Sequence, residues 1–289
     1  MMEKKTKKTL RRINVKRVTK TVRDLFIEAN TVLGDDVVCA LKSALPREES
    51  ATGIQVLEKI INNAEIAAQS KMPICQDTGL AVLFVEIGQD VHIVGDDLRT
   101  AIEEGVRQAY AEGFLRKSVC DPLTRKNTGD NTPAIIHIDI VEGDSLKIIA
   151  MPKGGGSENV SAAKMLTPAV GIDGIKKFVL ETVDLAGANP CPPIIVGIGI
   201  GGSLEQACIL AKKSLLRPVG EANSKDERLA QMEAELYTEI NKSGIGPGGL
   251  GGRITTLGVN VEMMPCHIAS LPVAVNIQCH VARHKETTL

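Results

Sequence analysis

The order of helical and strand patterns constrains the fold of this chain more than any other feature. Residues 16–70 place apolar side chains, among them Val18, Val22 and Phe26, at spacings of three and four, which is typical of amphipathic helices. Beyond residue 80, apolar runs rich in β-branched side chains alternate with further helical patterns. The sequence therefore predicts an α/β or mixed α+β fold, in which a helical N-terminal block precedes alternating strands and helices.

Several element boundaries are also predicted. Strands are expected at residues 80–88, 134–141, 145–151 and 193–200. The second and third of these flank Glu-Gly-Asp, so we expect a hairpin turn between them. Asp97 is expected to cap a helix that stops at Gly113. Ser203 and Ser224 are each followed three residues later by Gln or Glu, which is the capping-box pattern at a helix start.

Length and composition exclude several classes of protein. The 289 residues predict one domain over 1–289, with two subdomains at most and a boundary near 120–132 or 185–192. Aromatic residues make up 2% and the net charge is −1, which argues against nucleic-acid binding. No apolar run is long enough to cross a membrane.

The sequence also indicates a compartment. Residues 1–12 are basic but lack the apolar core of a secretory signal, so we expect a solvated start. Seven cysteines without such a signal predict a reducing, cytoplasmic location with few or no disulfides. Metal binding or catalysis then becomes the open question for these thiols.

Three cysteines lie in contexts that break regular structure. They are Cys75 in Pro-Ile-Cys-Gln-Asp-Thr-Gly, Cys191 in Asn-Pro-Cys-Pro-Pro and Cys279 in Asn-Ile-Gln-Cys-His. Three thiolates on loops can hold an iron–sulfur cluster and leave one iron open as a Lewis acid. Their separations of 191 − 75 = 116 and 279 − 191 = 88 residues are compatible with such a site but do not predict it.

A glycine-rich segment suggests an anion site. Lys153 is followed by Gly154, Gly155 and Gly156, and a helix is expected to begin there. Backbone N–H groups at a helix start attract anions, and the lysine adds a positive charge. The alternative is a flexible loop exit.

Polar residues near the cysteines each have more than one possible role. Asp77, with Gln76 beside it, could serve acid–base chemistry or cap its own turn. Arg116 could bind a carboxylate or be a solvated charge. His267 and His280 each follow a cysteine and could be a ligand, an acid or a buried histidine.

Gly197, Gly199 and Gly202 match the dinucleotide fingerprint between a strand and a helix. The alternative is close packing of that strand on the following helix. A nicotinamide-dependent enzyme is therefore one functional hypothesis.

Taken together, the motifs resemble a known family. They are Pro73–Gly79, Asn127–Asn131, Lys153–Asn159, Asn189–Pro193 and Pro265–His280. The chain resembles the iron–sulfur-dependent (class I) fumarases and L-tartrate dehydratases, and more closely the separate alpha subunit of the two-chain forms.

The resemblance implies roles for individual residues. Cys75, Cys191 and Cys279 would bind a [4Fe–4S] cluster with one iron not bound by protein. His267 matches an active-site histidine of the family. Its neighbour Cys266 is therefore not expected to be a cluster ligand. The expected substrate-binding residues, some matched to the family and some chosen, are Gln76, Asp77, Arg116, Lys153 and Gly155. The residues expected to transfer protons are Asp77 and His267.

The resemblance also implies an activity and a partner. We expect a hydro-lyase that converts fumarate to (S)-malate, with dehydration of L-tartrate to oxaloacetate as the alternative. A separate beta subunit would complete the active site, in an alpha2beta2 assembly. A non-catalytic scaffold subunit is the remaining hypothesis from another class.

Overall fold

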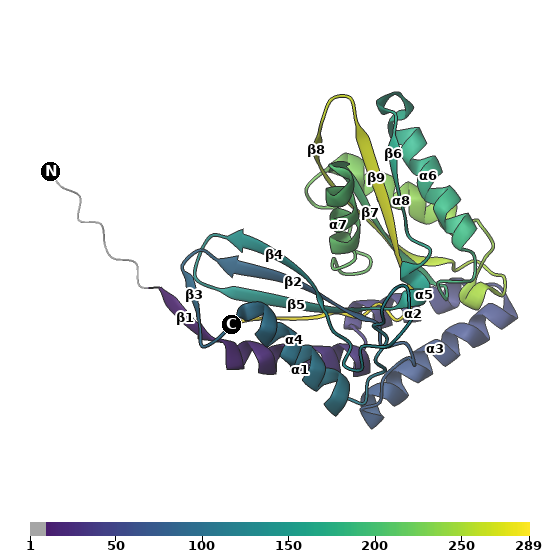
Figure 1. Ribbon diagram of the computed structural model, residues 1–289. Coiled ribbons are helices and arrows are strands. Elements are labelled where there is room, and N and C mark those ends of the chain that lie inside the picture. Colours follow the sequence, from purple (N-terminus) through teal and green to yellow (C-terminus); the bar gives the residue numbers. More distant parts are fainter. Residues whose placement is uncertain (1–9) are drawn as a thin grey trace. The chain divides into compact units, whose positions relative to one another are not determined.

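A computed structural model describes residues 10–289, so most of the basic N-terminal stretch lies outside the described residues (Figure 1). The chain divides into two compact units. Unit 1 contains residues 10–32, 71–153 and 283–289, and unit 2 contains residues 33–70 and 154–282. The ranges 120–132 and 185–192 each lie within one unit, and a single domain over the whole chain stays a prediction.

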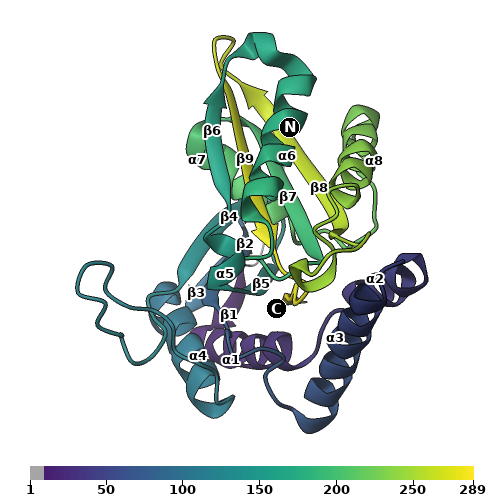
Figure 2. The same cartoon turned by 90° about the vertical axis from the view of Figure 1, so that its right-hand side faces the viewer.

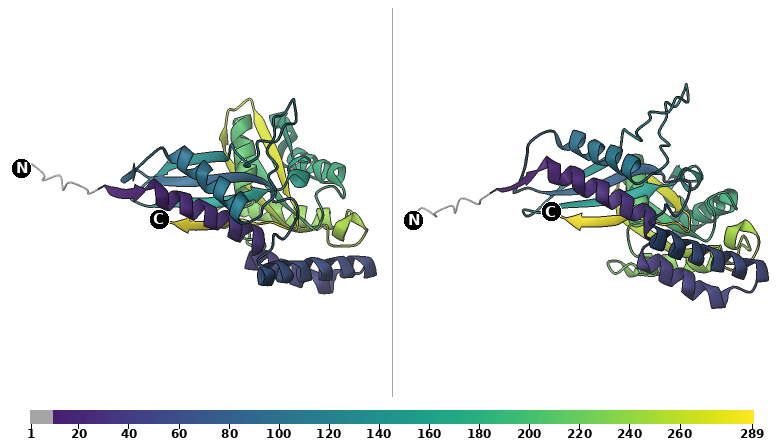
Figure 3. Two further views of the ribbon diagram at one scale, coloured as in Figure 1. Left: turned by 60° about the horizontal axis from the view of Figure 1, so that its bottom comes forward. Right: turned by 90° about the horizontal axis from the view of Figure 1, so that it is seen from below.

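Unit 1 is a four-stranded sheet with two helices on one face. Its elements are β1 (Arg11–Asn14), α1 (Val15–Thr31), β2 (Leu80–Gly88), β3 (Val91–Val94), α4 (Leu98–Glu112), β4 (Ile135–Val141), β5 (Leu146–Lys153) and β10 (Lys285–Thr288). The strand order is β10-β5-β2-β4, and β1 pairs separately with β3. Figure 3 shows α1, in purple, beside α4, in blue-teal.

The core of unit 1 follows the predicted periodicity. Val18, Val22 and Phe26 of α1 pack with α4 and with the inward side chains of β2 and β5. Asp97 caps α4 by accepting a hydrogen bond from Thr100 N, and Gly113 ends the helix. The predicted start and end of this helix are confirmed. Such ends can be predicted from sequence because capping depends on residues close in the chain.

The predicted hairpin is wrong. β4 and β5 both form, but β2 lies between them, parallel to β4 and antiparallel to β5. The turn at Glu142-Gly143-Asp144 therefore spans an intervening strand. The residues around the Glu-Gly-Asp turn carry no sign that β2, a strand from far earlier in the chain, pairs between β4 and β5.

Unit 2 is a second four-stranded sheet, covered by helices on both faces (Figure 2). Its elements are α2 (Asp35–Ala44), α3 (Ala51–Ser70), α5 (Gly155–Glu158), β6 (Ala162–Leu166), α6 (Gly171–Ala186), β7 (Ile194–Gly202), α7 (Leu204–Ser214), α8 (Glu227–Asn241), β8 (Thr256–Cys266) and β9 (Leu271–Gln278), with short 3-10 turns at Leu45–Arg47, Pro168–Val170 and Pro247–Gly249. The strand order is β6-β9-β7-β8.

The central strand of unit 2 has two different faces. Ile194, Val196 and Ile198 pack with α6 and α8. The opposite face carries Gly197 and Gly199 toward α7. Both helices and strands occur in each unit, so the mixed α/β prediction is confirmed.

Two helix starts differ in detail from the capping boxes. Ser203 is the N-cap of α7, but its side chain makes no capping bond. α8 begins one residue after Asp226, whose carboxylate accepts from Arg228 N, so Asp226 rather than Ser224 is the cap. A carboxylate next to the first turn satisfies these N–H groups as well as a hydroxyl does. None of the described helices is long and apolar enough to cross a bilayer.

Candidate active site

The predicted site residues are divided between the units. Unit 1 carries Cys75, Gln76, Asp77, Arg116 and Lys153, and unit 2 carries the remaining ones, which are Gly155, Cys191, His267 and Cys279. All seven cysteines lie among the described residues, and none of them forms a disulfide there. Within residues 10–289, no three His, Cys, Asp or Glu side chains converge as a metal site. Each unit therefore builds its own part of the predicted site.

In unit 1, residues 75–79 form a turn between α3 and β2, which we name the Cys75 turn. Asp77 Oδ1 accepts from Gly79 N at 3.0 Å, so Asp77 does cap its own turn. Asp77 N donates to Cys75 Sγ at 3.4 Å. This hydrogen bond directs a backbone N–H at the sulfur that the family resemblance assigns as a metal ligand. The two readings of this segment are therefore compatible.

Buried donors hold the Cys75 turn through its carbonyl groups. The Tyr110 hydroxyl lies 2.9 Å from Thr78 O and 2.8 Å from Gly79 O. Asn131 Nδ2 donates to Gly79 O at 3.2 Å. Burial raises the pKa of Tyr110, so this phenol remains a protonated donor. Both carbonyl groups of the turn therefore have buried donors.

Arg283 is a further buried donor, which the sequence did not single out. It donates through Nη2 to Asp77 O, and its side chain is only 3% exposed. Its Nε and Nη1 have no hydrogen-bond partner among the described residues. Buried guanidinium nitrogens without partners are costly, and a carboxylate is the group that matches their geometry. Its only local signal was a charged residue after the apolar pair Val281-Ala282.

Arg116 and Lys153 lie beside the same turn. Thr78 Oγ1 donates to Arg116 O at 2.9 Å, and the Arg116 side chain is exposed. Lys153 ends β5 and is 0% exposed. Its backbone lies so close to Gly79 that a Cβ there would come within 2.7 Å of it. Unit 1 therefore brings both cationic residues to the Cys75 turn.

In unit 2, Cys191 and Cys279 lie on neighbouring segments. Cys191 is exposed and has φ +55°, a left-handed conformation that is uncommon outside glycine. Its N donates to Ala188 O at 3.1 Å. Its carbonyl oxygen lies 2.9 Å from Nδ1 of His280, the residue after Cys279. His280 therefore joins the two segments, a role that the sequence left open.

The glycine-rich segment meets the same region. The expected helix is a single turn, α5, with Gly155 as its first residue. Ser157 Oγ donates to Gln278 Oε1 at 3.4 Å, immediately before Cys279. Gly155 and Cys279 are therefore brought close together within unit 2.

Glu48 fixes the segment that enters β8, and the sequence did not indicate this role. Its carboxylate is 5% exposed and accepts from four backbone N–H groups at 2.8–3.0 Å. The donors are Glu49, Ser50, Arg253 and Ile254. Burial alone would raise the pKa of Glu48, but these hydrogen bonds outweigh it and the pKa is lowered.

The segment held by Glu48 flanks Cys191. Ile194 N donates to Thr255 O at 2.8 Å, just beyond Ile254. Gly248 N donates to Pro192 O at 2.7 Å. The carboxylate thus supports both strands that meet next to the cysteine.

His267 lies in the connection between β8 and β9 and is exposed. Its Nδ1 accepts from Ala269 N at 3.2 Å, which places the proton of the neutral ring on Nε2. With Cys266, it lines a cavity of about 370 Å³ that is otherwise mainly apolar. The Cys266 thiol donates to Ser270 O at 3.1 Å, so it has a local partner.

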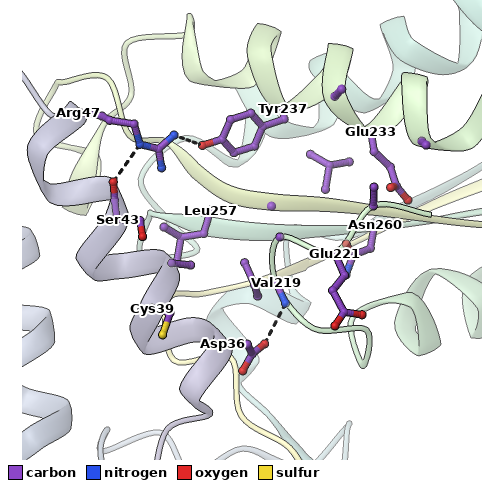
Figure 4. Close-up of a pocket in the computed structure, with 17 residues that line it drawn as sticks. Asp36, Cys39, Ser43, Arg47, Val219, Glu221, Glu233, Tyr237, Leu257 and Asn260 are labelled. Atoms are coloured by element: carbon purple, nitrogen blue, oxygen red, sulfur yellow. Dashed lines mark hydrogen bonds between the residues drawn. The ribbon is translucent and has the colours of Figure 1, made fainter. Parts of the chain in front are cut away.

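A larger cavity of unit 2, about 500 Å³, contains none of the predicted site residues (Figure 4). It lies between α2 and α8. Arg47 donates to the Tyr237 hydroxyl at 2.7 Å, and Asp36 accepts from Val219 N at 2.9 Å. These polar groups at its rim already have partners.

The glycines of the dinucleotide pattern have a packing role. A Cβ on Gly197 would lie 2.2 Å from Ala211 O, and one on Gly199 would lie 2.0 Å from Ala207 O. Only glycine allows α7 to approach β7 this closely. Packing therefore accounts for these two glycines without a nucleotide.

Comparison with known proteins identifies the family. The profile of the fumarate hydratase (Fumerase) family matches residues 19–288. A protein of Methanocaldococcus jannaschii with the provisional name L(+)-tartrate dehydratase subunit alpha is 47% identical over 275 residues, covering 92% of this chain and 95% of its own. The L(+)-tartrate dehydratase subunit alpha of Escherichia coli strain K12 is 32% identical over 279 residues, covering 95% and 91%.

The chain belongs to the fumarate hydratase (Fumerase) family. It is a hydro-lyase, as the motifs predicted. The resemblance to alpha subunits is confirmed by these relatives.

Proposed function

We propose that this chain is the alpha subunit of an L-tartrate dehydratase, which forms oxaloacetate. The names of its relatives support this substrate over fumarate. The structural observation that supports a dicarboxylate site is the Cys75 turn, which carries a thiol, an amide and a carboxylate. Beside it, two buried nitrogens of Arg283 have no hydrogen-bond partner among the described residues. Hydration of fumarate to (S)-malate is the second candidate, supported by the family description.

The donor set fits a [4Fe–4S] cluster held by Cys75, Cys191 and Cys279. None of the three thiols forms a disulfide among the described residues, and all three lie on turns or at strand ends. Cys75 Sγ already receives an N–H, and His280 links the other two segments. When bound, the cluster would supply a Lewis acid that makes hydroxide a better leaving group.

The protein's own groups would bind the substrate and move protons. Arg116, Lys153, Arg283, Gln76 and the Gly155 N–H are the donors for its carboxylates. Charge that develops on a carboxylate during proton removal is stabilised by such preorganised donors.

Protons at the hydroxyl side are assigned to His267 and Asp77. Because Nδ1 of His267 accepts from Ala269 N, Nε2 carries the N–H of the neutral ring, and this N–H would donate a hydrogen bond to the departing hydroxyl group. Asp77 would orient the same hydroxyl group, since its carboxylate belongs to the rigid Cys75 turn.

A separate beta subunit would provide the base that takes the carbon-bound proton, in a cytoplasmic alpha2beta2 enzyme. The relatives are named as alpha subunits, which supports a second chain.

The test is anaerobic co-expression with the partner chain, followed by turnover of L-tartrate, fumarate and L-malate. We expect L-tartrate to have the highest kcat/KM; preference for fumarate would select the second candidate. Full activity of the partner chain alone would make this chain a scaffold, and tight NAD binding without iron would revive the nucleotide hypothesis.

The cluster ligands are tested by matched cysteine substitutions. Cys75→Ala, Cys191→Ala and Cys279→Ala should each lose bound iron, measured by metal analysis and visible absorbance. Cys266→Ala is the control, because its thiol is bonded locally to Ser270. Iron lost from Cys266→Ala but kept in Cys191→Ala would overturn the ligand assignment.

A further inference from the structure

One edge of the unit 1 sheet is unusually apolar. β4 is the last strand in the order β10-β5-β2-β4, so within the described chain it pairs with β2 alone (Figure 1). Ile138 is 43% exposed and Ile140 is 79% exposed. The pairing with β2 runs without a bulge from Ile135 to Val141. A long, regular, apolar edge is a template for pairing with another strand.

The opposite edge of the same sheet is protected. β10 has only four residues, and Lys285 and Glu286 place opposite charges along it. Short edges with charged side chains are the usual defence against pairing between molecules. β4 has seven residues, of which four are isoleucine. The contrast indicates that the β4 edge has a partner.

Side chains of β4 alternate between the two faces of the sheet. Ile136 packs on the core beneath the helices of unit 1, so Ile138 and Ile140 project from the same face. His137 and Asp139 project from the other face. There, the His137 ring stacks on Phe84 of β2 with ring centroids 5.0 Å apart.

The sequence of β4 is complementary to itself. In an antiparallel pair of copies related by a two-fold axis through Ile138, His137 of each copy faces Asp139 of the other. In the same register, Ile136 faces Ile140 and Ile135 faces Val141. A facing imidazole–carboxylate pair and facing apolar pairs each stabilise such a sheet.

Neighbouring registers are unfavourable. An axis through His137 would bring two imidazoles together, and one through Asp139 would bring two carboxylates together. A shift of the β4–β4 register by a single residue would place the helices of the two copies on opposite faces of the joined sheet. The charges therefore select Ile138 as the centre.

We propose that β4 pairs with β4 of a second copy of this chain in this register. Two four-stranded sheets would join into one of eight strands. The pairing covers the exposed isoleucines and satisfies the outer backbone groups of β4. This contact involves neither the cysteines nor the substrate, so it stands independently of the proposed function.

The first experiment measures the mass of the full chain by light scattering during gel filtration. The wild-type chain should have the mass of two copies, and Ile140→Lys should raise the dissociation constant by about 100-fold, because lysine would face Ile136. Leu185→Lys is the control, since Leu185 is 86% exposed on α6. A wild-type chain with the mass of one copy, or equal behaviour of both variants, overturns the proposal.

Measurements on the complex with the partner chain show whether the β4 edge binds a second copy of this chain or the partner subunit. In that complex, Ile140→Lys should separate the two copies of this chain while each keeps its partner subunit. Loss of the partner subunit with the two copies still joined would assign the β4 edge to the partner and overturn the proposal.

A second experiment tests the register. With the axis through Ile138, the two Ile138→Cys residues face each other with Cα atoms about 4.5–5.5 Å apart, within the range of a disulfide. Two Ile140→Cys residues would be four positions apart, about 13 Å. Mild oxidation should cross-link the first variant at least 10-fold faster than the second or the parent chain. Equal cross-linking of the two variants would refute this register.

Discussion

The two units hold their cysteines with opposite chemistry. In unit 1, buried donors from Tyr110, Asn131 and Arg283 bind the carbonyl groups of the Cys75 turn. In unit 2, one buried carboxylate, Glu48, gathers backbone N–H groups beside Cys191. With its carbonyl groups held by these donors, the Cys75 turn directs Asp77 N at the Cys75 sulfur and Gly79 N at the Asp77 carboxylate. In unit 2, the N–H groups are all bound to the Glu48 carboxylate, so this arrangement only positions the backbone beside Cys191.

The largest effect is expected from removing the charge in unit 2. Glu48→Gln keeps the shape but places an amide NH₂ against N–H donors, and should lower the free energy of unfolding by about 3 kcal/mol. Urea unfolding of the full chain measures this. Glu49→Gln is the control, because Glu49 only pairs with Arg253 at the surface. Equal losses in both variants would contradict the comparison.

In unit 1, substitution of the buried Arg283 should lower kcat/KM but leave the free energy of unfolding nearly unchanged. Arg283→Met removes two unpaired nitrogens together with one hydrogen bond, so the free energy of unfolding should change by less than about 1 kcal/mol. Loss of a carboxylate donor should lower kcat/KM about 100-fold. Steady-state kinetics of the complete enzyme and urea unfolding test both parts. A stability loss like that of Glu48→Gln, with unchanged kcat/KM, would make Arg283 a purely structural donor.

A smaller effect is expected from the phenol behind the Cys75 turn. Tyr110→Phe removes the hydrogen bonds to Thr78 O and Gly79 O and should cost about 1 kcal/mol. A looser turn should also make Cys75 react faster with iodoacetamide, as followed by mass spectrometry in cluster-free protein. Tyr237→Phe, in the cavity of Figure 4, is the matched control and should leave the Cys75 rate unchanged. Identical Cys75 rates in both variants would count against the bracing role.

The smallest effect is expected from acid. The pKa of Glu48 is lower in the folded chain than its ordinary value of 4.5. Its contribution is therefore complete above that value and is lost as the pH falls through the folded pKa. The stability difference between wild type and Glu48→Gln should shrink as urea unfolding is repeated from pH 6 toward pH 3. A difference that grows in acid would show that the carboxylate is not stabilised by the four N–H groups.

Local patterns predicted most elements of both units. Apolar periodicity placed α1 and β2, and Asp97 capped α4 as expected, because these features depend on residues close in sequence. The pairing of β4 with β2 rather than β5 depends on a strand far earlier in the chain. Such pairings leave no signal in the turn itself.

The cysteine motifs and their neighbours could be found from the sequence, but their supports could not. Glu48 lies in Pro-Arg-Glu-Glu-Ser, where it resembles an ordinary surface charge. Its burial depends on the backbone at Arg253, more than two hundred residues later. His280 was considered for several roles, and only the structure shows its bond to Cys191 O.

The interleaving of the two units has a consequence for biosynthesis. β10 pairs with β5, and it follows all of unit 2 in the chain. Unit 1 therefore cannot complete its sheet until every residue of unit 2 has been translated. During that interval β5 has one unprotected side, which makes the nascent chain dependent on rapid folding of unit 2 or on chaperones.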